Sequence, residues 1–283
     1  MSGGSGTVAF LIGIAIVTDE AIELTQLLIT QFSAEAAMLS ALMELLTPDD
    51  QLVSYNGKSY DLPLLITRFR MQGLVHPFKT LPHLDLVHPM RRLFAHRWPD
   101  CRLMTVEERL LGLIRIDDLP GSQAPEAWFN YLQCGDARRL IRVIKHNHQD
   151  IISLAVAHST LSISIQQPEE HDVDIYRLAR WLSEFIECEA VVLLERKYGS
   201  LCHNAIRLLA ELHRRNARWK KAIPLWEQLA ESDCKESIER LAKYHEHISK
   251  DYSMAWDYCK RLPIDVKNEH RRMRVYKKLS KIK

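Results

Sequence analysis

One stretch of the sequence, residues 51–69, constrains the fold most strongly. Residues 51–54 predict a short strand, and residues 62–69 have the apolar spacing of a helix. The turn between them places Asp61 at the beginning of that helix. A carboxylate there can cap free backbone N–H groups and face the positive end of the helix dipole. It can equally hold a divalent metal ion in a cleft at the carboxyl end of a sheet, and both interpretations stay open.

A second stretch places a histidine and a carboxylate on one face of a helix. Residues 137–157 have the apolar periodicity of a helix, and His146 and Asp150 lie four residues apart within it. Such a pair suits a metal-bound water, because the aspartate can hold the ion and the histidine can accept the proton. A solvated polar turn is the alternative interpretation of the same residues.

Together, the two stretches resemble the second and third motifs of the DEDD exonuclease superfamily, which has a ribonuclease H-like fold. Asn56, Tyr60 and Asp61 match the pattern Asn-x-x-x-Tyr-Asp, and His146 with Asp150 matches His-x-x-x-Asp. The sequence is most similar to the YprB-type ribonuclease H-like family, over residues 2–165. Further matching segments, in order, are residues 53–63, 83–86, 91–93, 117–121 and 124–125.

The resemblance implies a metal-dependent 3′–5′ exonuclease that hydrolyses DNA or RNA with Mg²⁺ or Mn²⁺. It implies that Asp61 and Asp150 are metal ligands and that His146 is the general base. Four further residues would shape the cleft or position the site and the substrate: Asn56, Tyr60, Asp85 and Arg91.

One part of the family pattern has no counterpart. The superfamily's first motif is Asp-x-Glu on a first, central strand, and the sequence contains no Asp-x-Glu. Residues 1–6 resemble the Gly/Ser-rich turn that follows this motif in the family, although they can also be a flexible linker. We expect the first strand to be missing, codons upstream of Met1 to encode the motif, and the chain itself to be inactive or impaired.

Other segments of this half predict an α/β fold with a ribonuclease H-like mixed sheet. Residues 8–17 and 22–30 predict a hairpin. Residues 102–113 predict a helix with Glu107 and Glu108 on its exposed side.

The 283 residues allow about two domains, which we place at residues 1–165 and 166–283, joined by a polar linker over residues 164–174. Trp219 and Ala222 recur as Tyr252 and Ala255 at an offset of 33 residues. This offset approaches the period of about 34 residues in tetratricopeptide helix pairs. We therefore expect an all-α helical-repeat domain, with a generic helical bundle as the alternative. Its predicted helices are residues 175–186, 190–198, 201–214, 217–230, 235–247, 252–262 and 266–279.

Composition bears on location and partners. The six cysteines form no Cys-x-x-Cys pair, and we find no signal peptide or bilayer-length apolar run, which indicates a cytoplasmic protein without a membrane partner. Ten basic residues from Lys260 onward can neutralise nucleic-acid phosphates or simply solvate a helix end. Nucleic acid is the expected partner, and a protein partner could bind the repeats. The alternative function is a non-catalytic nucleic-acid- or protein-binding scaffold.

Overall fold

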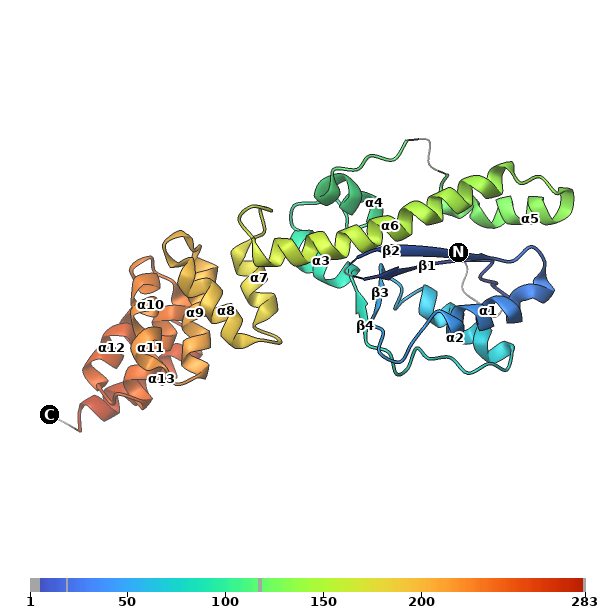
Figure 1. Cartoon of the computed structure of the whole chain (residues 1–283). Helices are drawn as coiled ribbons and strands as arrows, with labels where there is room; N and C mark the ends of the chain where they lie inside the picture. Colours follow the sequence, from blue (N-terminus) through green and yellow to red (C-terminus); the bar gives the residue numbers. More distant parts are fainter. Residues whose placement is uncertain (1–5, 19, 117–118, 282–283) are drawn as a thin grey trace. The chain divides into compact units, whose positions relative to one another are not determined.

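The structure is a computed structural model that describes residues 6–18, 20–116 and 119–281. The chain forms two compact units, residues 1–171 and residues 172–283 (Figure 1). The Gly/Ser-rich beginning over residues 1–5, and Asp117-Asp118 of the family match, lie outside the described residues.

Two small sheets form the centre of the first unit. Strands β1 (Leu11–Val17) and β2 (Ile22–Leu28) make the expected antiparallel hairpin. Strands β3 (Leu52–Ser54) and β4 (His83–Asp85) pair in parallel. The predicted α/β fold is confirmed, and its mixed strand directions occur as one antiparallel and one parallel two-stranded sheet rather than as a single sheet.

Helices cover the hairpin on both faces. The helical segments of this unit are η1 (Phe32–Ala34), α1 (Glu35–Glu44), α2 (Asp61–Met71), α3 (Val87–Phe94), α4 (Leu103–Val106), the π-helical turn η2 (Glu107–Leu111), η3 (Gly121–Gln123), α5 (Ala124–Cys134) and α6 (Arg138–Gln166). Figure 1 shows α5 and α6 on one side of the hairpin and α1 and α2 on the other. The predicted linker therefore begins inside α6, which continues to Gln166.

The alternation of β1 side chains explains the two layers. Ile12 and Ile14 pack against the buried apolar residues of α1 and α2. Gly13 points to the opposite face, where a Cβ atom would lie only 2.8 Å from Cγ1 of Ile151 and would also overlap the side chain of Asn147 on α6. Since glycine lacks this atom, α6 can approach the sheet closely.

The helix predicted over residues 102–113 is present over residues 103–111, but it is not α-helical throughout. The segment forms α4 and then the π-helical turn η2, which ends at Gly112 with a φ of 69°. The insertion of a π turn shifts the helical face, and Glu107 is 0% exposed, whereas the side chain of Glu108 remains 54% exposed. The expected exposure therefore holds for Glu108 and is wrong for Glu107.

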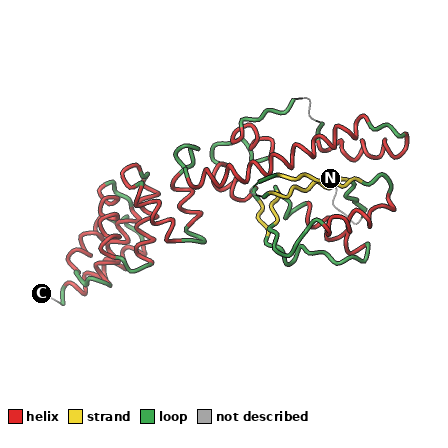
Figure 2. Tube along the Cα trace, in the orientation of Figure 1, coloured by secondary structure: helices red, strands yellow, loops and turns green. Residues whose placement is uncertain are grey.

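The second unit is helical throughout its described residues, as Figure 2 shows by its red helices and green turns. Its segments are α7 (Ile175–Leu182), α8 (Glu187–Arg196), η4 (Tyr198–Ser200), α9 (His203–Arg215), α10 (Trp219–Glu231), α11 (Lys235–His247), α12 (Tyr252–Arg261) and α13 (Val266–Leu279). Consecutive α-helices pack against each other. Left-handed residues reverse the chain between α9 and α12: Ala217, Asp233 and Lys250.

The predicted recurrence falls on equivalent positions of two helices. Trp219 and Tyr252 are the first residues of α10 and α12, and Ala222 and Ala255 are both 0% exposed. A small residue at each of these positions lets neighbouring helices approach closely. No helix that the structure describes combines the length and the apolar character needed to cross a bilayer.

Candidate functional site

The turn between β3 and α2 carries the first group of candidate residues. Asn56 has a left-handed φ of 61°, which asparagine tolerates well. The buried carboxylate of Asp85, at the end of β4, holds this turn. Its Oδ1 accepts from the backbone N–H of Asn56 at 2.6 Å and of Val87 at 3.3 Å, and its Oδ2 accepts from the N–H of Lys58 at 3.0 Å. Asp85 therefore fixes the shape of the turn through the backbone.

Gly57 is required at the centre of the same turn. A Cβ atom at this position would lie 2.6 Å from Oγ of Ser54 and 3.3 Å from Oδ2 of Asp61. Any other residue would push the turn away from β3 or displace the Asp61 carboxylate. The turn thus brings backbone, strand and carboxylate together at the carboxyl end of β3.

Asp61 is the first residue of α2, and the N-cap position before it belongs to Tyr60, whose side chain makes no capping hydrogen bond. Asp61 as a residue is exposed, yet neighbouring protein atoms crowd its carboxylate. This partial burial raises the pKa of Asp61, and the negative charges of Asp85 and Asp150 raise it further, against a lowering hydrogen bond from its own backbone N–H. Two carboxylates from other parts of the sequence therefore act on Asp61 here.

His146 and Asp150 lie on α6 with the geometry that their spacing predicts. Nε2 of His146 is 3.3 Å from Oδ2 of Asp150, and the two side chains are 23% and 34% exposed. Because the charge of Asp150 acts on Asp61, the structure brings the two predicted metal ligands into the same region.

A largely buried cation that no sequence motif indicates lies beside this pair. Arg115 forms a two-point ion pair with Glu107, from Nε to Oε2 at 2.5 Å and from Nη2 to Oε1 at 2.8 Å. Nη2 of Arg115 also donates to Oδ1 of Asp150 at 2.5 Å, and its Nη1 donates to Nδ1 of His146 at 3.2 Å. The hydroxyl of Ser153 donates to the Glu107 carboxylate. Residues 107, 115 and 150 share no sequence motif. The one relevant signal is the arginine between two isoleucines, Ile114-Arg115-Ile116, which is consistent with an inward-facing charge.

Two candidate residues lie at the margin. Tyr60 is 62% exposed and free to meet a ligand. Arg91 is exposed on α3, where its charge acts on Tyr55 and Cys101, and the hydroxyl of Tyr55 donates to the backbone oxygen of Cys101 at 2.6 Å. Arg91 is therefore placed beside the strand that leads into the turn.

The donor set suits a divalent cation only in part. Carboxylate oxygens are the ligands that Mg²⁺ and Mn²⁺ prefer, and the mutual repulsion recorded in the raised pKa of Asp61 is relieved by a cation. Within residues 6–18, 20–116 and 119–281, however, no group of three or more His, Cys, Asp or Glu side chains is arranged to hold a metal ion. Asp61 and Asp150 therefore supply part of a metal site.

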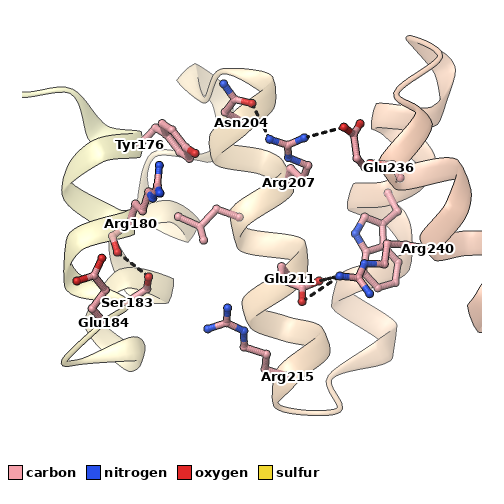
Figure 3. Close-up of a pocket in the computed structure, with 13 residues that line it drawn as sticks. Tyr176, Arg180, Ser183, Glu184, Asn204, Arg207, Glu211, Arg215, Glu236 and Arg240 are labelled. Carbon is pink, nitrogen blue, oxygen red and sulfur yellow. Dashed lines mark hydrogen bonds and ion pairs between the residues drawn. The ribbon is translucent and has the colours of Figure 1, made fainter. Parts of the chain in front are cut away.

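The second unit contains a polar hollow of about 550 Å³ between α7, α9, α10 and α11 (Figure 3). Arg207 is held by Asn204 at 3.1 Å and Glu236 at 3.5 Å, and Arg240 is held by Glu211 at 3.3 Å. The charged side chains that line the hollow are Arg180, Glu184, Arg207, Glu211, Arg215, Glu236 and Arg240. Arginines and glutamates thus both line the hollow, and Arg207 and Arg240 are each paired with one of these glutamates.

Small sheets covered by helices, with Asp61 and Asp85 at the turn that follows β3, fit a ribonuclease H-like domain. A family model described as RNase_H superfamily matches residues 1–162. The chain belongs to the RNase H superfamily.

A curated relative extends the match beyond this domain. The chain is 30% identical over 270 residues to a protein of Bacillus subtilis (strain 168) described as uncharacterized protein YprB. The alignment covers 90% of this chain and 64% of that protein, so the chain spans just under two thirds of the relative's length. The expected YprB-type ribonuclease H-like membership is thereby confirmed. No solved structure matches the chain at a significant level.

Proposed function

We propose that the first unit is the greater part of a metal-dependent nuclease domain, which removes nucleotides from a 3′ end of DNA or RNA. One observation carries the proposal: burial and the charges of Asp85 and Asp150 raise the pKa of Asp61, and Asp150 belongs to the histidine–aspartate pair on α6. Backbone N–H groups bind Asp85 and Arg115 binds Asp150, whereas Asp61 keeps a raised pKa, and a carboxylate in such surroundings costs stability unless a cation binds it.

The residues divide the work of phosphodiester hydrolysis. Asp61 and Asp150 would hold a divalent ion, Mg²⁺ or Mn²⁺, which supplies charge stabilisation and a water of lowered pKa. His146 would accept the proton of the attacking water. Asp85 keeps the turn that carries Asp61 in shape, and Tyr60 and Asn56, which belong to the same turn, would shape the substrate cleft.

Two carboxylates are too few for the two-metal mechanism that the resemblance implies. We propose that an Asp-x-Glu motif on a further strand completes the site. In support, β1 pairs only with β2, and β3 only with β4, among the strands that the structure describes. β1 and β3 therefore each have a second edge, at which a further strand could form hydrogen bonds.

The test uses the product of the complete reading frame with 5′-labelled single-stranded DNA and RNA and Mn²⁺. We expect stepwise shortening from the 3′ end. His146→Ala should lower turnover by about 10²-fold or more, as loss of a general base does. A melting temperature that falls while the turnover of the folded enzyme stays intact would remove His146 from the catalytic residues.

A second candidate function rests on the hollow of the second unit. The arginines and glutamates that line it suit a protein segment that carries both charges, and in this case the unit would act as a scaffold. Two results together would favour this function. The protein would release no nucleotides in the presence of Mn²⁺, and residues 172–283 would specifically bind a protein partner.

A further inference from the structure

We propose that Arg115 is an internal cation that competes with a divalent metal ion for Asp150 and, while it is bound there, withholds the proton-accepting nitrogen of His146. The inference rests on the proposed nuclease function and adds to it a built-in restraint. It concerns residues that the family motifs do not include.

The hydrogen bonds fix what Arg115 does to the pair. A guanidinium group has only donors, so both groups that meet it must accept. Oδ1 of Asp150 accepts from Nη2 at 2.5 Å, and Nδ1 of His146 accepts from Nη1 at 3.2 Å. A neutral imidazole whose Nδ1 accepts carries its proton on Nε2, the nitrogen that faces Oδ2 of Asp150 at 3.3 Å. Both ring nitrogens and both carboxylate oxygens are thus engaged.

This arrangement is incompatible with catalysis by the same residues. His146 can accept a proton from water only with a lone pair that points at the water, and that lone pair is directed at Arg115. A divalent ion on Asp150 would meet the positive guanidinium at the same oxygen, and like charges repel strongly in a partly buried site. Metal binding and the Arg115–Asp150 contact therefore oppose each other.

Burial shows how Arg115 can leave Asp150 without becoming unpaired. The side-chain exposure rises along the network, from 0% for Glu107 and 10% for Arg115 to 23% for His146 and 34% for Asp150. Glu107 holds the guanidinium at two points on its buried side. Arg115 can keep its ion pair with Glu107 while it releases His146 and Asp150. No buried charge is then left without a partner, which would be costly.

The backbone around Arg115 is suited to such a movement. Ile114 and Ile116 are 80% and 91% exposed, so Arg115 is the inward-facing anchor of its local segment. This segment follows the left-handed Gly112 and has no regular secondary structure from Gly112 to Arg115. Movement of Arg115 therefore breaks no helix or sheet hydrogen bonds.

The experiment measures Mn²⁺ binding to the 283-residue chain by the electron paramagnetic resonance signal of free Mn²⁺. The first variant is Glu107→Gln with Arg115→Gln, which removes the cation and leaves no buried charge behind. We expect it to bind Mn²⁺ about tenfold more tightly than the parent, within the usual range of coupling between two sites. The matched control is Glu126→Gln with Arg139→Gln, an exposed ion pair of 2.6 Å in the same unit, and it should bind as the parent does.

A second variant separates direct competition from a general change in charge. Arg115→Lys keeps the positive charge but lacks the planar fork that spans Glu107 and Asp150 together. Direct competition predicts tighter Mn²⁺ binding for this variant as well. Parental affinity in Arg115→Lys, or weaker binding in either variant, would overturn the inference and make Arg115 a residue that positions Asp150.

Asp150→Asn distinguishes failure of the inference from failure of the proposed function. If this variant loses Mn²⁺ binding while the Arg115 variants bind as the parent does, the metal site stands and the restraint is refuted. If Asp150→Asn binds Mn²⁺ unchanged, Asp150 is no ligand, and both the proposed function and the inference fall.

Discussion

Two carboxylates, Asp61 in the first unit and Glu246 in the second, have opposite surroundings. The side chain of Glu246 is 0% exposed and accepts from Arg274 at 2.6 and 2.8 Å and from Lys278 at 2.8 Å. Burial raises the pKa of Glu246, but these hydrogen bonds outweigh it and lower the pKa to about 2. Asp61 instead has a raised pKa beside Asp85 and Asp150.

The difference separates a structural carboxylate from a candidate ligand. Glu246 ties α11 to α13, and its negative charge is saturated by the protein itself. Burial and the charges of Asp85 and Asp150 raise the pKa of Asp61, which is costly for its ionised form unless a cation binds. Asp150 is intermediate, because Arg115 supplies the cation from within.

Asp150→Asn should show the largest effect. In the product of the complete reading frame, we expect nuclease activity to fall by about 10³-fold, since loss of a ligand removes several kcal/mol of charge stabilisation. The melting temperature should change by only a few degrees, because Asp150 is partly exposed. Activity within threefold of the parent at saturating Mn²⁺ would place Asp150 with the structural carboxylates.

Glu246→Gln should show the reverse pattern. The variant loses charged hydrogen bonds from Arg274 and Lys278, and we expect the second unit to lose about 2 kcal/mol of stability. Chemical denaturation followed by circular dichroism measures this loss, and Mn²⁺ binding provides the control. A change in Mn²⁺ affinity would show that the two units are not independent in this respect.

Acid should act on the two regions with opposite sign. The pKa of Glu246, and of Glu239 beside Lys243, Lys267 and Arg271, is lowered from 4.5 to about 2. Their contribution is therefore fully present above pH 4.5 and is lost as the pH falls toward 2. The raised pKa of Asp61 makes its contribution favourable at low pH and lost as the pH rises above 3.8. Melting curves of the parent and of Glu246→Gln between pH 2 and 4.5 check this, and Glu246→Gln should make the stability of the second unit depend less on pH.

Asp61→Asn should show the smallest effect on stability. Asparagine keeps the size of the side chain and removes the charge that Asp85 and Asp150 repel. Relief of this repulsion, reduced by solvent and by the lost helix-dipole interaction, should raise the melting temperature by about 1–2 °C. Mn²⁺ binding should weaken at the same time. A lower melting temperature with unchanged Mn²⁺ binding would instead make Asp61 a helix cap.

Local patterns predicted much of the fold, because they act between residues close in sequence. The apolar run of β1, the turn before Asp61 and the spacing of His146 and Asp150 are all of this kind. The ion pair between Glu107 and Arg115, and its contact with Asp150, join segments whose spacing carries no periodic signal. The π turn that buries Glu107 is likewise decided by tertiary contacts. The sequence therefore indicated the candidate ligands and missed the cation that holds one of them.

Gly13 sets the distance between β1 and the helix that carries His146 and Asp150. The gap that its missing side chain leaves is filled by Asn147, the residue next to His146, and Gln26 of β2 donates to the Asn147 side chain at 2.8 Å and to the backbone oxygen of Ile144 at 2.9 Å. These contacts of the β1–β2 hairpin fix the position of α6 relative to the sheet. A displacement of about 1 Å can cost ~10²-fold in rate. A larger residue at position 13 would therefore displace α6, and with it His146 and Asp150.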